Sequence, residues 1–187
     1  MNHDEAKRLI NACPSDVRTL VQLALLTGAR YGELCALDVR DFQVESGTLF
    51  IRDSKSGKPR HIILNAEGAN FCRQLVAGRA LGLPLLTRAN GTRWGRDHHF
   101  RAFRDAAKAA KLDQAFSFHG LRHTWASLTV MAGAPLIVVA HNLGHRDTRM
   151  VEKHYGHLTA NYVSETIRRT APSFGIVADK KVVPFGT

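Results

Sequence analysis

An arginine and a glutamate lie close together in the segment TGARYGEL, which follows an apolar run ended by a glycine. Arg30 and Glu33 are three residues apart, and on a helical turn this spacing lets the carboxylate reach the arginine side chain or its backbone. A guanidinium stays charged and meets two phosphate oxygens at once. The pair therefore fits a phosphate-binding group, and on its own it fits an ordinary surface ion pair as well.

Two lysines lie in DSKSGK, between the β-type runs TLFIRD and RHIIL, and this pattern predicts the tip of a hairpin. Lys55 and Lys58 either remain solvated and oppose edge pairing, or reach into a DNA groove or beside a leaving oxygen. Gly57-Lys58 resembles the end of a P-loop, but the upstream glycine is missing and no helix follows. We therefore exclude a P-loop.

The segment HGLRHTWAS opens a predicted helix and carries two histidines and an arginine. His119 and Arg122 are three residues apart, so both face one side while Leu121 turns toward the core. His119 and His123 have the spacing of a metal-binding pair, but Gly120 stands where the HExxH zinc pattern needs its glutamate. We expect no metal site here, because carboxylate ligands are missing.

A histidine and a tyrosine stand at either end of LGHRDTRMVEKHY. Tyr155 lies ten residues after His145, at the end of a predicted short helix. A tyrosine near a helix end normally packs its ring and leaves its hydroxyl wet. A tyrosine can also act as a nucleophile when cations and a proton acceptor help it to ionise.

In chain order these segments supply Arg, Lys, His-x-x-Arg, His and Tyr, and this order resembles the tyrosine recombinases, also called the phage integrase family. TGARYGEL resembles the first arginine box, DSKSGK the hairpin lysine, HGLRHTWAS the central box and LGHRDTRMVEKHY the final segment. The resemblance spans residues 18–158 and misses no position of the catalytic set. It implies the catalytic-domain fold of DNA breaking-rejoining enzymes. It also implies a site-specific recombinase or integrase that cleaves and rejoins DNA through a 3′-phosphotyrosyl intermediate.

The same resemblance implies a role for each residue. Tyr155 is the nucleophile, and Arg30 and Arg122 grip the non-bridging oxygens of the scissile phosphate. His119 manages the proton of the nucleophile, and Lys55 protonates the departing 5′ oxygen.

The resemblance also implies that His145 hydrogen-bonds the phosphate and that Glu33 and His123 support the catalytic residues. The residues expected to bind DNA are Lys58, Arg60 and Arg146. The resemblance implies neither a cofactor nor a metal, because arginines, lysine and histidines supply the positive charge.

The charge balance is strongly basic, with 26 lysines and arginines against 16 aspartates and glutamates and a net charge of +10. This predicts a polyanionic partner, double-stranded DNA first of all. The resemblance adds other recombinase protomers, forming a tetramer on DNA from a monomer in solution. No membrane span or signal peptide is predicted, and we expect a cytoplasmic protein, bacterial or phage-encoded. Three scattered cysteines indicate buried free thiols.

The periodicity predicts a mainly α chain with one small antiparallel sheet (α+β), and strands do not alternate with helices as a parallel sheet requires. We expect a catalytic domain over 1–171. The tail 172–187 contains the apolar run VVPF and either hangs loose or docks on a neighbour. We expect no N-terminal core-binding domain of the kind that the resemblance implies for the family. Predicted strands cover 48–53 and 60–64, and predicted helices cover 4–12, 16–27 after a Ser15 cap, 31–37, 65–78, 95–111, 119–132, 135–142, 147–155 and 159–170.

Two other functions fit parts of this pattern. A DNA-binding module without turnover would be basic and helical, but the full catalytic set argues against it. A type IB topoisomerase-like strand-passing enzyme shares the fold and residues, while the short length and the HGLRH box resemble the integrases more closely.

Overall fold

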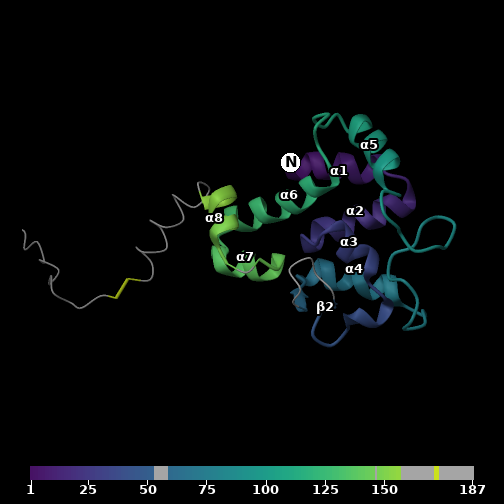
Figure 1. The fold of residues 1–187 in the computed structure, drawn as a ribbon, viewed down its shortest axis with the longest axis horizontal. Helices are drawn as coiled ribbons and strands as arrows, with labels where there is room; N and C mark the ends of the chain where they lie inside the picture. The colour runs from purple at the N-terminus through teal and green to yellow at the C-terminus, as the bar shows by residue number, and fades with distance from the viewer. Residues whose placement is uncertain (53–58, 146, 157–170, 173–187) are drawn as a thin grey trace, which may run out of the picture.

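The computed structural model describes residues 1–52, 59–145, 147–156 and 171–172 (Figure 1). This part of the chain is mostly helical with one small antiparallel sheet, as the sequence predicts. Its helices are α1 (His3–Ala12), α2 (Ser15–Thr27), α3 (Tyr31–Ala36), the 3-10 turn η1 (Val39–Asp41), α4 (Ala66–Val76), α5 (Phe100–Ala109), α6 (Phe118–Met131), α7 (Leu136–Leu143) and α8 (Arg149–Tyr155).

The helix ends follow local capping chemistry. The Asn65 side chain accepts a hydrogen bond from the Gly68 N–H at 2.8 Å and caps α4, as predicted. Helix α2 ends at Gly28, whose φ of 65° is the left-handed conformation that glycine adopts without strain. Two boundaries differ from expectation: Pro14 rather than Ser15 precedes α2, and α5 begins at Phe100 rather than near residue 95. The predicted helix over 159–170 lies outside the described residues.

The sheet has three antiparallel strands in the order β1 (Phe42–Gln43), β2 (Thr48–Ile51) and β3 (Arg60–Ile63). The predicted hairpin is confirmed, with Ile51 paired to Arg60 at the end nearest the connection. The two-residue strand β1 is too short to give a periodicity signal in the sequence. In β3, Arg60 and Ile62 face the interior while their neighbours are exposed, so the hairpin buries a charged residue.

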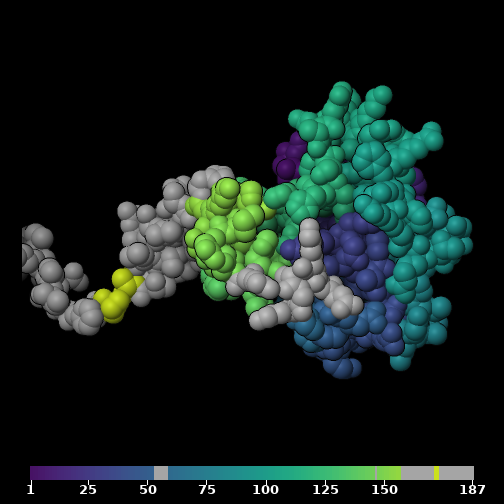
Figure 2. All heavy atoms as spheres, in the orientation of Figure 1, coloured from purple at the N-terminus to yellow at the C-terminus, as the bar shows by residue number. Residues whose placement is uncertain are grey.

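The buried side chains form two hydrophobic clusters. The larger one holds α1 to α5, the sheet and the start of α6, and includes Leu34, Ile62 and Leu121. The smaller one joins the second half of α6 to α7 and α8, and includes Val139 and Tyr155. Helix α6 spans both, and α7 and α8 extend from one side of the main body (Figures 1 and 2).

Polar groups connect the two clusters. The Asn142 side chain accepts from the Ile63 N–H at 3.2 Å and donates to the Thr27 carbonyl at 3.3 Å. The Arg122 guanidinium donates to the Gly28 carbonyl at 2.9 Å and to the Leu143 carbonyl at 2.8 Å. These contacts fix α7 against the ends of α2 and β3, so the predicted site residues lie where the clusters meet.

Two further expectations concern the whole chain. Within the described residues, no helix is both long and apolar enough to cross a membrane. Cys13, Cys35 and Cys72 are buried free thiols, as predicted, and burial raises the pKa of Cys13 and Cys35 to about 11 and that of Cys72 to about 12. Thiols held this far from ionisation are poor nucleophiles.

Candidate active site

The first arginine lies at the start of α3 and is held by Glu33. The Glu33 carboxylate accepts from the Arg30 backbone N–H and from its Nη1, both at 2.9 Å, so both contacts that the spacing predicts are present. Burial by itself raises the pKa of Glu33, but the hydrogen bonds from Arg60 and Arg30 outweigh it and lower that pKa. Glu33 is therefore a buried anion, while the Arg30 side chain remains 26% exposed.

Arg60, which the sequence interpretation expects to bind DNA, is the first residue of β3 and is buried. Its side chain is only 7% exposed, and its Nη1 and Nη2 meet both Glu33 oxygens at 3.0 and 2.9 Å. Its Nε donates to the Asn142 carbonyl at 3.0 Å. The guanidinium of Arg60 is thus engaged by a buried carboxylate and a buried carbonyl, and its DNA contact stays a prediction.

The segment HGLRHTWAS forms the first half of α6 and faces as predicted. Leu121 is fully buried in the larger cluster, while His119 and Arg122 turn to the opposite side. Arg122 is 4% exposed, and burial first, then repulsion from Arg30, lowers its pKa to about 10. Its guanidinium lies at the ends of α2 and α7, where helix carbonyls carry partial negative charge that offsets part of this cost.

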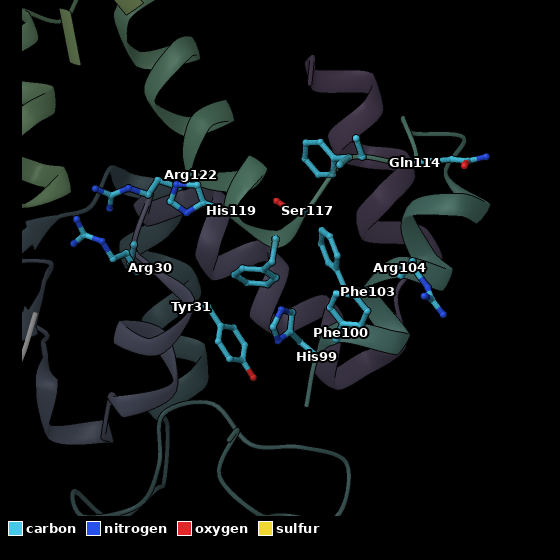
Figure 3. A pocket seen from close by; sticks show the side chains of 14 residues that line it. Arg30, Tyr31, His99, Phe100, Phe103, Arg104, Gln114, Ser117, His119 and Arg122 are labelled. Atoms are coloured by element: carbon cyan, nitrogen blue, oxygen red, sulfur yellow. The ribbon is translucent and has the colours of Figure 1, made fainter. Parts of the chain in front are cut away.

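A pocket of about 430 Å³ opens beside these residues. Arg30, His119 and Arg122 gather at one end of it, and Tyr31, His99, Phe100 and Phe103 line the other (Figure 3). The pKa of His119 is lowered by burial and then by His123 and Arg122, so the ring is neutral at neutral pH. The guanidinium groups of Arg30 and Arg122 extend in the same direction, away from the aromatic end of the pocket (Figure 3). Two neighbouring guanidinium groups beside a neutral histidine suit an oxyanion such as phosphate.

The last histidine contacts the second arginine. Arg122 Nη2 lies 3.1 Å from His145 Nε2, and because a guanidinium has no acceptor, this nitrogen of His145 is unprotonated. Burial, followed by Arg122 and Arg30, lowers the pKa of His145. Gly144 makes the turn from α7 to His145 with a φ of 73°.

Tyr155 ends α8 and is buried in the smaller cluster, with its hydroxyl 2.5 Å from Nδ1 of His123. Burial raises the pKa of Tyr155, and the nearby Arg122 only partly opposes this. The pKa of His123 is lowered by burial and then by His154 and Arg122, so its ring is a neutral hydrogen-bond partner. Tyr155 is therefore protonated, and its hydroxyl lies next to a neutral histidine that can accept the proton.

The sequence predicted most of this arrangement and missed one part. The contacts form three groups at the junction of the two hydrophobic clusters, and electrostatic interactions of Arg122 with Arg30 and Tyr155 link these groups. The groups are Arg30 with Glu33, Arg122 with His145, and His119 with His123 and Tyr155. Lys55, Lys58 and Arg146 lie outside the described residues. Asn142, which fixes α7 beside the arginines, was missed because an asparagine within an apolar helix gives no motif.

Among the described residues, no group of three or more His, Cys, Asp or Glu is placed to hold a metal ion. The cationic and neutral donors at the pocket lack the carboxylate ligands that Mg²⁺ or Ca²⁺ prefers. Glu33 is engaged by two arginines and has no position free for a metal.

Comparison with known families decides the assignment. Residues 1–162 match the model of the phage integrase family. The chain belongs to this family. It is 32% identical over 183 residues to the integrase of Salmonella phage P22, and the aligned region covers 91% of this chain and 46% of that protein.

Solved structures of the family share the fold. The catalytic domain of bacteriophage HP1 integrase matches with a TM-score of 0.70 and 23% identity, over 92% of this chain and 94% of that one. A lambda integrase tetramer bound to a Holliday junction matches with a TM-score of 0.65 and 24% identity, over 82% of this chain and 47% of that one. The predicted catalytic-domain fold is thus confirmed. The chain spans about half the length of the curated relatives it matches first, from 46% to 60%.

Proposed function

We propose that this chain is the catalytic part of a site-specific DNA recombinase that cleaves and rejoins DNA through a 3′-phosphotyrosyl intermediate. One observation carries the proposal: the Tyr155 hydroxyl contacts His123, and both interact electrostatically with Arg122, which in turn interacts with Arg30. Family membership and the basic charge support the same conclusion.

In the first step, the scissile phosphate binds at the end of the pocket formed by Arg30, His119 and Arg122. Its oxygens take the Arg122 donor that His145 holds in the free protein, and His145, once protonated beside the anion, donates in turn. The Tyr155 oxygen attacks phosphorus while its proton passes to a histidine. The phosphorus–5′-oxygen bond breaks, and that oxygen takes up a proton. The 3′-phosphotyrosine keeps the energy of the cleaved ester, so rejoining needs no ATP.

The two histidines near Tyr155 divide the work by position. His123 touches the hydroxyl, whereas His119 lies beside His123 with ring centroids 4.9 Å apart and lines the phosphate pocket. We therefore propose that His123 accepts the proton of Tyr155 first. His119 lies beside His123 and faces the phosphate pocket. This refines the sequence interpretation, which gave His119 the proton and His123 only a supporting role.

The proposed roles of the residues outside the described ranges rest on the family resemblance. Lys55 is the proposed general acid for the 5′ oxygen, and Lys58 and Arg146 are proposed backbone-phosphate contacts. Double-stranded DNA and further copies of the recombinase are the proposed partners, in line with the lambda integrase tetramer on a Holliday junction. Acting on DNA, the protein would work in the cytoplasm.

The test is covalent trapping. A duplex carrying the cognate site, nicked beside the cleavage position so that the 5′-hydroxyl fragment dissociates, should leave a covalent protein–DNA adduct. Peptide mass spectrometry should place the phosphodiester on Tyr155. Tyr155→Phe should bind the same duplex with unchanged affinity and give no adduct, because only the nucleophilic oxygen is removed.

An adduct in Tyr155→Phe would show that the nucleophile is wrong. Adduct formation with supercoil relaxation, but without strand exchange between two sites, would instead favour the topoisomerase-like function. Tyr31→Phe is the matched control, because its hydroxyl donates to the Gly95 carbonyl at 2.7 Å away from the arginines.

A further inference from the structure

Arg60 is a buried cation that the proposed mechanism does not use. It is the first residue of β3, and its guanidinium meets both Glu33 oxygens while its Nε meets the Asn142 carbonyl. Three chain segments that are far apart in sequence, around residues 33, 60 and 142, converge on this one side chain. A buried arginine with this many fixed contacts sets geometry.

Gly144 leaves the room that Arg60 occupies. A Cβ at this glycine would lie 2.8 Å from Cζ of Arg60, closer than real contacts allow, and the φ of 73° favours glycine as well. The guanidinium therefore packs directly under the turn that leads from α7 to His145. The position of this turn and the position of Arg60 depend on each other.

Glu33 is shared between two arginines with different exposure. Its Oε1 accepts from both Arg30 Nη1 and Arg60 Nη1, and Arg60 also takes Oε2. If Arg60 were removed, the buried carboxylate would keep its ion pair with Arg30 and would draw the Arg30 guanidinium into a two-pronged pair. Arg30 would then turn away from the pocket it lines.

We propose that Arg60 is a positioning residue that holds Glu33 and the turn before His145, so that Arg30 and His145 face one bound phosphate. Arg60 itself contacts no DNA. This inference rests on the proposed function, since the phosphate at Arg30 and Arg122 is the substrate group.

A first experiment separates positioning from direct DNA contact. Binding of the whole chain to a non-specific duplex is measured over a range of salt concentrations. The comparison is made in an Arg30→Ala background, where a loss of the Arg30 contact can no longer contribute. If Arg60 bound a DNA phosphate, adding Arg60→Met there would still lower the slope of log K against log [salt] by about 0.9. Positioning through Arg30 predicts no further change in slope, and a further decrease near 0.9 would overturn the proposal.

A second experiment measures the phosphate site with orthovanadate, an oxyanion that adopts the five-coordinate geometry of phosphoryl transfer. Calorimetric titration of the whole chain should show vanadate binding that Arg60→Met weakens by about tenfold or more. Arg60→Lys keeps the charge but loses the fork, and should recover only part of the affinity. Gly144→Ala, which keeps Arg60 but displaces it, should weaken vanadate binding as well.

The matched control lies at the other end of α3. Arg93 contacts the buried Asp38 and the carbonyls of Cys35 and Leu37, so Arg93→Met also breaks an arginine–carboxylate pair that holds this helix. It should leave vanadate affinity unchanged in the folded protein. Equal losses in Arg60→Met and Arg93→Met would show general loosening of α3 and overturn the specific role.

A double-mutant cycle tests whether Arg60 acts through Glu33. If Arg60 acts through Glu33, the combination of Arg60→Met and Glu33→Gln should bind vanadate about as well as Glu33→Gln alone. Fully additive losses would mean that Arg60 acts independently and would overturn the proposal. If the unaltered chain bound no vanadate while Tyr155 still formed its DNA adduct, positioning for phosphate would fail and the proposed function would stand.

Discussion

Helix α3 has a buried carboxylate near each end, and the two are surrounded by arginines in different ways. Glu33 lies in its first turn with Arg30 and Arg60, while Asp38 follows its last turn with Arg40, Arg52 and Arg93. Both carboxylates are held ionised, so their charges alone do not distinguish them.

The difference lies in where the arginines point. Arg52 and Arg93 divide their donors between Asp38 and nearby carbonyls of the chain, so this group ties α3 to η1 and to neighbouring loops. At Glu33, Arg60 takes the structural contacts, and Arg30 lines a pocket that also holds His119 and Arg122. A cluster of arginines becomes a candidate site when one of them is held by the protein and still faces an open space.

The largest expected effect distinguishes the arginines around Glu33 from those around Asp38. Arg30→Ala should reduce the rate of covalent adduct formation by about 10²- to 10³-fold, because it removes a charge that stabilises the transition state. Its melting temperature should change little, since Glu33 keeps Arg60. Adduct formation on the nicked duplex and thermal unfolding measure the two quantities.

Arg93→Ala is the counterpart and should show the reverse. Arg93→Ala should lower the free energy of unfolding by about 1 kcal/mol. This is the lower end of the range for a buried charge that loses a partner, because Arg40 and Arg52 still contact Asp38. The adduct rate of the folded protein should be unchanged. A large loss of rate would mean that the Asp38 cluster also serves catalysis, and the contrast between the two clusters would fail.

The next effect concerns His123, which contacts Tyr155 and His119. His123→Asn should slow adduct formation by about 10²-fold, because it removes the group that accepts the tyrosine proton. In the unaltered protein the rate should rise with pH through the lowered pKa of His123, since only the neutral ring accepts a proton. The pH profile of single-turnover cleavage checks both statements.

His154→Asn is the control for this prediction. Its ring lies near His123, with centroids 5.7 Å apart, and its charge lowers the pKa of His123. Removing it should therefore move the acidic limb of the profile to higher pH with little change in the maximal rate. An acidic limb that stays in place in both variants would assign the titration to another group.

The smallest effect tests the structural role of Asp38 through pH. The hydrogen bond from Arg93 lowers the pKa of Asp38 to about 2, so the ionised form stabilises the fold. That stabilisation is complete above the unfolded pKa near ~4 and is lost as the pH falls through about 2. The gap in melting temperature between the unaltered protein and Asp38→Asn should accordingly narrow from pH 5 to pH 2. A constant gap would mean that the Asp38 charge contributes nothing.

The sequence predicted the elements well where a local signal exists. The Asn65 cap, the end of α2 at Gly28 and the β2–β3 hairpin follow from residue type and spacing. Helix α5 begins five residues later than predicted, because Asp97 and its neighbours form a turn with φ of 61° at Asp97 that no periodicity reveals.

The site divides in the same way. The candidates Arg30, His119, Arg122, His145 and Tyr155 came from the order of their segments, which resembles the phage integrase family, while each segment by itself also fits an ordinary structural role. Arg60 was expected to bind DNA, and its sequence position beside the basic hairpin does not show what its side chain contacts. Its partners are Glu33 and Asn142, 27 and 82 residues away in the chain, and only the folded protein brings them within hydrogen-bonding distance. Whether a cation faces substrate or supports another residue depends on burial and long-range contacts, and these arise only when the two hydrophobic clusters pack together.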